Sequence, residues 1–134
     1  MDAKYEAATA LVMRFFRGLD TRDHAAVAAL MAPDGVWVRQ GTRLNGPAAV
    51  MAALEQRPAN RVTCHLISNL WAEQFDEQRA RLNFYLTAYE GVMENGALTG
   101  TRMAGVRYCT DELVYLEGGW RIKEKSSVAH MPAP

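Results

Sequence analysis

The sequence has no excess of charge of either sign. Its 134 residues include 15 Lys and Arg against 15 Asp and Glu, so the formal net charge at pH 7 is zero. Proteins that bind the phosphate backbone of nucleic acids carry a basic patch, and no local cluster of Lys and Arg stands out in this chain. We therefore expect no nucleic-acid partner.

A long apolar run is missing as well. The apolar stretch at residues 11–16 contains Arg14 and is followed by Arg17, which argues against both a signal peptide and a membrane span. We therefore expect no membrane partner and a cytoplasmic location. The only cysteines, Cys64 and Cys109, are too few for a disulfide framework and lack the spacing of a zinc site, so we interpret both as reduced thiols.

The motifs of cofactor, metal and acyl-enzyme sites are also missing. No glycine-rich loop leads into a helix, because the glycines at residues 96–105 lie where hairpins are expected. The three histidines lack the spacing of metal ligands. Ser68, Ser126 and Ser127 do not lie in the strand-to-helix turn of a nucleophile elbow. We therefore expect neither a cofactor nor a metal.

The first part of the chain has helical spacing. Apolar residues over 3–19 fall on one stripe of a helix. Asp23 can cap a second helix that carries Met31 and stops at Pro33, where a turn is expected. A short strand and a glycine-flanked loop follow, and a third helix is predicted over residues 47–56.

After Pro58 the spacing becomes extended. Residues typical of strands, separated by hairpin signals, predict four long strands over residues 61–75, 78–92, 101–117 and 120–128. Helices followed by long strands predict one α+β domain over residues 1–134, in which a curved antiparallel or mixed sheet wraps around about three helices and encloses a cone-shaped pocket. The last four residues are expected to be frayed.

One acid and one histidine could meet inside this pocket. Asp20 continues the apolar stripe of the first helix, so its side chain should lean toward the interior. His65 lies in mid-strand among apolar residues, where an isolated histidine is more often a core residue held by a hydroxyl or a carbonyl. If Asp20 reaches the imidazole, it would fix its tautomer and raise its basicity. Asp20 and His65 are therefore candidate catalytic residues; the alternative is that Asp20 is a simple turn residue.

Five further residues are candidates for substrate binding. Arg39 could be a solvated charge at a strand end or the anchor for a substrate carboxylate or enolate oxygen. Asp111 lies in a long apolar strand, where a carboxyl group needs a partner or stays protonated. Trp71, Tyr85 and Tyr89 could line a pocket for a ring-shaped apolar ligand, although such aromatic residues mostly form the core.

Several short motifs, taken in order, resemble a known family. They are residues 19–23 (LDTRD), 30–37 (LMAPDGVW), 45–47 (NGP), 61–69 (RVTCHLISN) and 118–122 (GGWRI). Their order resembles the SnoaL-like branch of the nuclear transport factor 2-like superfamily. The resemblance covers nearly the whole chain and implies a cone-shaped α+β fold and a homodimer formed through the outer face of the sheet.

The same resemblance implies a role for the acid and the histidine. Asp20 and His65 are similar in position to the Asp and His pair of scytalone dehydratase and hexachlorocyclohexane dehydrochlorinase, two cofactor-free eliminating enzymes of this superfamily. We therefore expect a cofactor-independent lyase or isomerase that acts on a small, largely apolar, cyclic substrate. The alternatives are a non-catalytic ligand-binding or assembly domain and a polyketide-cyclase-like enzyme, since one fold serves many functions.

Overall fold

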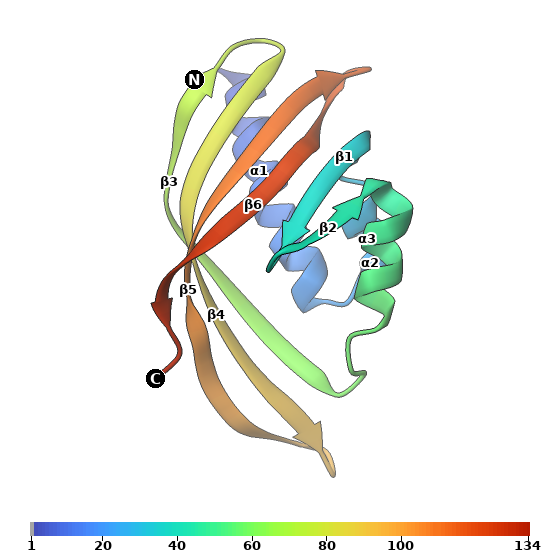
Figure 1. Ribbon diagram of the computed structural model, residues 1–134, viewed down its shortest axis with the longest axis vertical. Coiled ribbons are helices and arrows are strands. Elements are labelled where there is room, and N and C mark those ends of the chain that lie inside the picture. Colours follow the sequence, from blue (N-terminus) through green and yellow to red (C-terminus); the bar gives the residue numbers. More distant parts are fainter. Residues whose placement is uncertain (1) are drawn as a thin grey trace.

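A computed structural model describes residues 2–134, which form three helices and six strands (Figure 1). In chain order these are α1 (Ala3–Asp20), α2 (His24–Ala28), β1 (Met31–Arg39), β2 (Thr42–Asn45), α3 (Gly46–Glu55), β3 (Arg61–Phe75), β4 (Arg79–Glu94), β5 (Ala97–Leu116) and β6 (Gly119–Pro132). None of the helices in this part of the chain combines the length and the apolar character needed to cross a membrane.

All six strands belong to one mixed sheet with the order β2-β1-β6-β5-β4-β3. Neighbouring strands are antiparallel, except that β1 and β6 run parallel. The long strands curve, and the three helices lie on the concave side of the sheet (Figure 1). Strands β2 and β3 form its two edges, so the sheet stays open. The predicted α+β class and the curved sheet wrapped around the helices are confirmed.

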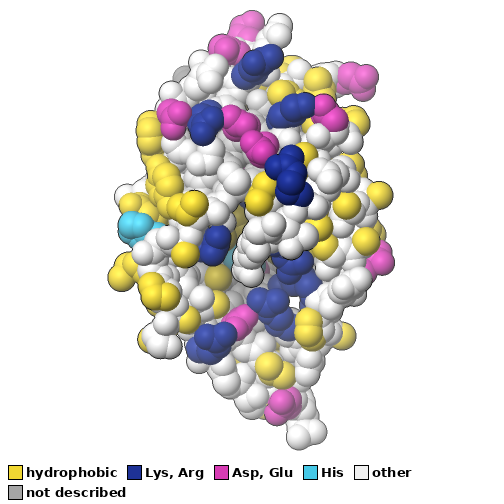
Figure 2. Space-filling model, in the orientation of Figure 1, with side chains coloured by type: hydrophobic (Ala, Val, Ile, Leu, Met, Phe, Trp, Pro, Cys, Tyr) yellow, Lys and Arg dark blue, Asp and Glu magenta, His cyan; other side chains and the backbone are white. Residues whose placement is uncertain are grey.

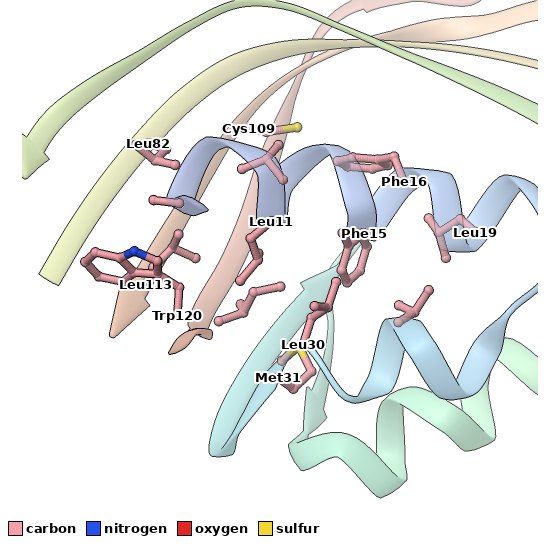
Figure 3. Packing of buried hydrophobic residues seen from close by; sticks show 14 of the residues in the cluster. Leu11, Phe15, Phe16, Leu19, Leu30, Met31, Leu82, Cys109, Leu113 and Trp120 are labelled. Atoms are coloured by element: carbon pink, nitrogen blue, oxygen red, sulfur yellow. The ribbon is translucent and has the colours of Figure 1, made fainter. Parts of the chain in front are cut away.

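Helix α1 fills the inside of this curve. Asp2 caps its N-terminus by accepting a hydrogen bond of 2.8 Å from the backbone N–H of Lys4. The apolar stripe that the sequence predicts is buried, and it includes Ala8, Leu11, Val12, Phe15, Phe16 and Leu19. Figure 3 shows side chains of this stripe packed with others from the sheet, such as Leu82, Leu113 and Trp120. Burying each large side chain contributes about 1.5–3 kcal/mol, which fixes α1 and its C-terminal Asp20 against the sheet.

The segment after α2 differs from the prediction. The second helix ends at Ala28, and Met31 begins β1 instead of continuing the helix. Pro33–Gly35, expected as a turn, forms an irregular part of β1 where the register against β6 shifts. A Cβ atom on Gly35 would overlap the backbone carbonyl of Ile122, so only glycine allows this close approach. Pairing with a strand far along the chain thus overrides the local helical pattern.

Two other segments are more extended than predicted. The glycine-flanked loop before α3 contains strand β2, which pairs with β1. Strand β6 continues through Pro132, and Met131 and Pro132 pair with Val106 and Gly105 of β5. Half of the C-terminal segment that the sequence predicts to be frayed, Met131 and Pro132, is therefore part of the sheet.

Candidate active site

A cavity of about 230 Å³ lies between the helices and the concave face of the sheet. Phe16 from α1, Trp37 from β1 and Leu86 from β4 contribute to its apolar wall. Basic side chains also line it, namely Arg39, Arg57, Arg61, His65, Arg107 and Lys125. Figure 2 shows Lys and Arg side chains gathered around a hollow in one face of the molecule. The cavity therefore combines an apolar interior with positive charge.

The structure brings Asp20 and His65 together. Nδ1 of His65 lies 2.6 Å from Oδ1 of Asp20, and the backbone N–H of His65 donates to Oδ2 of Asp20 at 2.9 Å. Because the carboxylate accepts from Nδ1, the neutral imidazole carries its proton there and Nε2 keeps its lone pair. Within residues 2–134, Nε2 has no hydrogen-bond partner, and His65 lines the cavity. This geometry can present a basic nitrogen to a ligand.

Two residues that the sequence did not single out hold Asp20 in place. The hydroxyl of Thr63 donates to Oδ1 of Asp20 at 2.8 Å. Arg57 donates at 3.2 Å both to that hydroxyl and to the backbone carbonyl of Leu19. Thr63 lies two residues before His65, so strand alternation could have pointed to it. Arg57 follows α3, and nothing in its local sequence indicates its contact with β3.

Burial decides the protonation of His65. Burial lowers the pKa of His65 below its ordinary value of 6.5, while the hydrogen bond and the charge of Asp20 raise it. Arg57 and Arg61 add to the lowering of this pKa. The sequence predicted that Asp20 would make His65 more basic; Asp20 does act in that direction, but burial outweighs it. The imidazole is therefore neutral at pH 7, which is the form that can accept a proton.

A second acid and base lie beside the same cavity. Nζ of Lys125 lies 3.0 Å from each carboxylate oxygen of Asp111, which is completely buried. The same nitrogen lies 4.4 Å from the ring centroids of both Phe15 and Phe16, a favourable placement for a cation. Burial raises the pKa of Asp111, and the Lys125 ammonium opposes this effect.

Asp111 itself does not line the cavity, which differs from its predicted role in substrate binding. Its partner Lys125 does line it, and the sequence analysis missed that residue. The two face each other in the register of β5 and β6. Because that register depends on pairing between strands, spacing along one strand could not have identified the partner.

The three aromatic candidates lie outside the cavity. Asn69 has a φ of 54°, and the register of β3 against β4 shifts there, so a bulge reverses the alternation of side chains beyond it. Trp71 consequently points outward and is half-exposed. Tyr85 and Tyr89 do share a face of β4, but it is the face opposite the buried Phe84. None of the three lines the cavity, contrary to the expectation from the sequence.

Arg39 lines the cavity, as its interpretation as an anchor requires. Its guanidinium carbon lies 5.5 Å from the ring centroid of Trp37. Burial lowers the pKa of Arg39, with a further contribution from the charge of Arg61. An arginine nevertheless stays protonated in proteins. Arg39 therefore places a positive charge in the cavity wall.

Cys109 also lines the cavity, but it is not a nucleophile at neutral pH. Burial raises the pKa of its thiol to about 11, and the thiolate is the reactive form. Residues 2–134 contain no group of three or more His, Cys, Asp or Glu side chains arranged to hold a metal ion. The chemistry that this geometry offers is proton transfer by His65 beside fixed positive charges.

The fold has known relatives. Residues 3–126 match the SnoaL-like domain. The chain belongs to this family. A comparison of this chain with curated proteins finds no match.

Solved structures similar to this SnoaL-like domain include Aln2 from a Streptomyces species, with 22% identity, a TM-score of 0.77 and coverage of 93% of this chain and 89% of Aln2. A protein from Novosphingobium aromaticivorans provisionally named scytalone dehydratase has 19% identity, a TM-score of 0.82 and coverage of 95% and 84%. The type 2 hexachlorocyclohexane dehydrochlorinase LinA has 16% identity, a TM-score of 0.82 and coverage of 98% and 89%. At these identities the similarity shows a common fold.

Proposed function

We propose that this SnoaL-like domain is a cofactor-independent lyase or isomerase in which His65 removes a proton from a small ligand bound in the cavity. The observation that carries the proposal is the 2.6 Å contact between Nδ1 of His65 and Asp20, which leaves Nε2 free beside the cavity. The names of two structural relatives denote dehydration and dehydrochlorination, and both are eliminations. A binding domain without catalysis needs no such pair.

In the proposed reaction, Nε2 of His65 takes a proton from a carbon next to an electron-withdrawing group. The electrons of the broken C–H bond form a double bond. In a lyase they expel a leaving group, and in an isomerase the proton returns at another carbon. Asp20 stabilises the imidazolium, and Arg39 and Lys125 stabilise the negative charge that develops on the ligand.

The test is proton removal by variants at His65. A panel of small cyclic carbonyl, hydroxy and halogenated compounds is incubated in D₂O, and ¹H NMR follows elimination, isomerisation and exchange of the acidic C–H. His65→Gln should lower the rate by about a hundredfold to ten-thousandfold, which is the usual contribution of a general base. His130→Gln, at an exposed position on β6, is the matched control. A wild-type rate in His65→Gln would overturn the proposal.

We further propose that the domain forms a homodimer through the outer face of its sheet. Apolar side chains on the face away from the helices are 37–64% exposed, namely Val62, Leu66, Trp71, Tyr89 and Val128. Light scattering coupled to size-exclusion chromatography should give a dimer for the wild type and a monomer for Leu66→Glu. A wild-type monomer at tens of micromolar would contradict this part of the proposal.

A further inference from the structure

The cavity wall contains more positive charge than its surroundings neutralise. Five Lys and Arg side chains line the cavity, while no Asp or Glu among residues 2–134 lines it. Two of the five are paired with carboxylates behind the wall. Arg61 contacts Glu90 at 2.9 Å, and Lys125 contacts Asp111 at 3.0 Å.

The other three cations have no carboxylate within ion-pair distance in the described part of the chain. Arg57 donates to a backbone carbonyl and to the hydroxyl of Thr63. Arg107 donates to the hydroxyl and the carbonyl of Ser127. The guanidinium of Arg39 has no hydrogen-bond partner within residues 2–134, although Arg39 lines the cavity. Arg39 therefore keeps its full set of donors for a ligand.

Like charges crowd this part of the wall. The pKa of Arg39 is lowered by burial and by Arg61. The pKa of Arg57 is lowered by burial and by Arg61, Arg22 and Arg39, and the charge of Asp20 only partly opposes this. A positive charge that is both buried and close to other positive charges is stabilised by an anion. Arginine suits a carboxylate in particular, because its planar fork can donate two parallel hydrogen bonds.

We propose that the ligand of this cavity is a small organic acid and that Arg39 binds its carboxylate. This inference takes the cavity of the proposed function as the ligand site, but it concerns binding and needs no turnover. The apolar wall around Phe16, Trp37 and Leu86 accommodates the carbon skeleton of the acid. The ligand class differs from the largely apolar substrate expected from the sequence, because the sequence did not show how many cations share one wall.

The test compares each acid with its uncharged amide of nearly the same shape. The probes are acetate and acetamide, benzoate and benzamide, and cyclohexanecarboxylate and cyclohexanecarboxamide, titrated at pH 7 and low salt by calorimetry and NMR. At least one acid should bind about tenfold or more tightly than its amide, as a charged hydrogen bond provides. Added salt should weaken this preference.

Variants at Arg39 locate the anchor. Arg39→Gln should remove the preference for the acid, and Arg39→Lys should keep part of it, because the charge remains without the planar fork. Arg14→Gln, which removes an exposed arginine of α1 that does not line the cavity, should leave the preference unchanged. Equal affinities for acid and amide in all three pairs overturn the inference, and so does a preference that survives Arg39→Gln.

His65→Gln separates this inference from the proposed function. The preference for the acid should persist in His65→Gln, since the anchor is Arg39, while turnover should be lost. If turnover persists in His65→Gln but the acid preference still depends on Arg39, the proposed function fails and the ligand class stands. If turnover is lost in His65→Gln and every acid binds like its amide, the ligand class fails and the proposed function stands.

Discussion

The two acid and base pairs beside the cavity use their carboxylates differently. Both carboxylate oxygens of Asp111 contact Nζ of Lys125. The oxygens of Asp20 instead contact three groups: the imidazole of His65, the backbone N–H of His65 and the hydroxyl of Thr63. The side chains of Asp20 and His65 are 18% and 13% exposed, against 0% and 4% for Asp111 and Lys125. The Asp20–His65 pair is open enough to exchange a proton with a ligand, whereas the Asp111–Lys125 pair is an ion pair closed to solvent.

Phe16 connects the two pairs. The imidazole of His65 lies 5.2 Å from the ring of Phe16, and Nζ of Lys125 lies 4.4 Å from the same ring centroid. A ligand beside this ring can therefore meet the imidazole of His65 and the Nζ of Lys125 together. The acid is an aspartate in both pairs, so the base and the extent of burial distinguish the pair that can take part in proton transfer from the pair that is closed to solvent.

The largest expected effect on stability comes from breaking the buried pair of Asp111 and Lys125. Asp111→Ala should lower the free energy of unfolding by about 3–5 kcal/mol, because it leaves the charge of Lys125 buried without a partner. Urea unfolding measures this change. Replacing both members, with Asp111→Leu and Lys125→Met, should recover most of the loss because no unpaired charge remains. A loss below about 1 kcal/mol in Asp111→Ala would show that water reaches Lys125.

Removing the charge of Asp20, in the more exposed pair with His65, should have a smaller effect on stability. Asp20→Asn should lower the free energy of unfolding by about 1.5–3 kcal/mol through the loss of charged hydrogen bonds. It should also lower the pKa of His65 further, because the Asp20 carboxylate raises that pKa. NMR titration of the imidazole measures the shift. Asp23→Asn is the control, since asparagine also caps a helix well at this N-cap position. An unchanged pKa in Asp20→Asn would show that the pair does not couple.

A still smaller effect is expected at Thr63, which supports Asp20 from behind. Thr63→Val keeps the shape of the side chain but removes the hydroxyl that joins Arg57 to Asp20. The free energy of unfolding should fall by about 1 kcal/mol, and Thr63→Ser should restore it. Thermal and urea unfolding of the two variants measure the difference. Equal stability of the valine and serine variants would mean that the hydroxyl does not hold Asp20.

The smallest expected effect is the contribution of His65 to the pH dependence of stability. The pKa of His65 in the folded protein lies below its value of 6.5 in the unfolded chain, so the unfolded chain binds more protons between these two values. Stability is therefore unaffected by His65 above about pH 6.5 and falls as the pH drops from there to the folded pKa. His65→Gln should lose this component and His130→Gln should keep it. Urea unfolding at a series of pH values measures it, and identical profiles for wild type and His65→Gln would contradict it.

The sequence predicted those features that depend on spacing within one element. The stripe of α1 placed Asp20 toward the interior, and the extended pattern of residues 61–75 placed His65 in a strand with matching bounds. Features that depend on pairing between distant segments could not be predicted in this way. They include the position of Lys125 opposite Asp111 and the contact of Arg57 with β3.

In β3, the side-chain direction that the sequence predicts holds only as far as the strand is regular. Thr63 and His65 keep their alternation and face the interior, but the bulge at Asn69 turns Trp71 to the outside. A bulge inserts one residue without changing the apolar composition of a strand, so composition and alternation do not reveal it. The same limit applies to Met31, which pairs with Ile122 of β6, and to Pro33, which lies in the irregular stretch where the register against β6 shifts.

The bulge at Asn69 also disfavours the addition of a strand from another molecule at the β3 edge of the sheet. Strand β3 is an outer strand of the open sheet and spans 15 residues, so one side of its backbone has N–H and C=O groups without a partner strand. A long straight edge of this kind is a template for adding strands from other molecules and leads to aggregation. Because the bulge bends the strand and interrupts the even spacing of these groups, a second strand can match only a short stretch on either side of it.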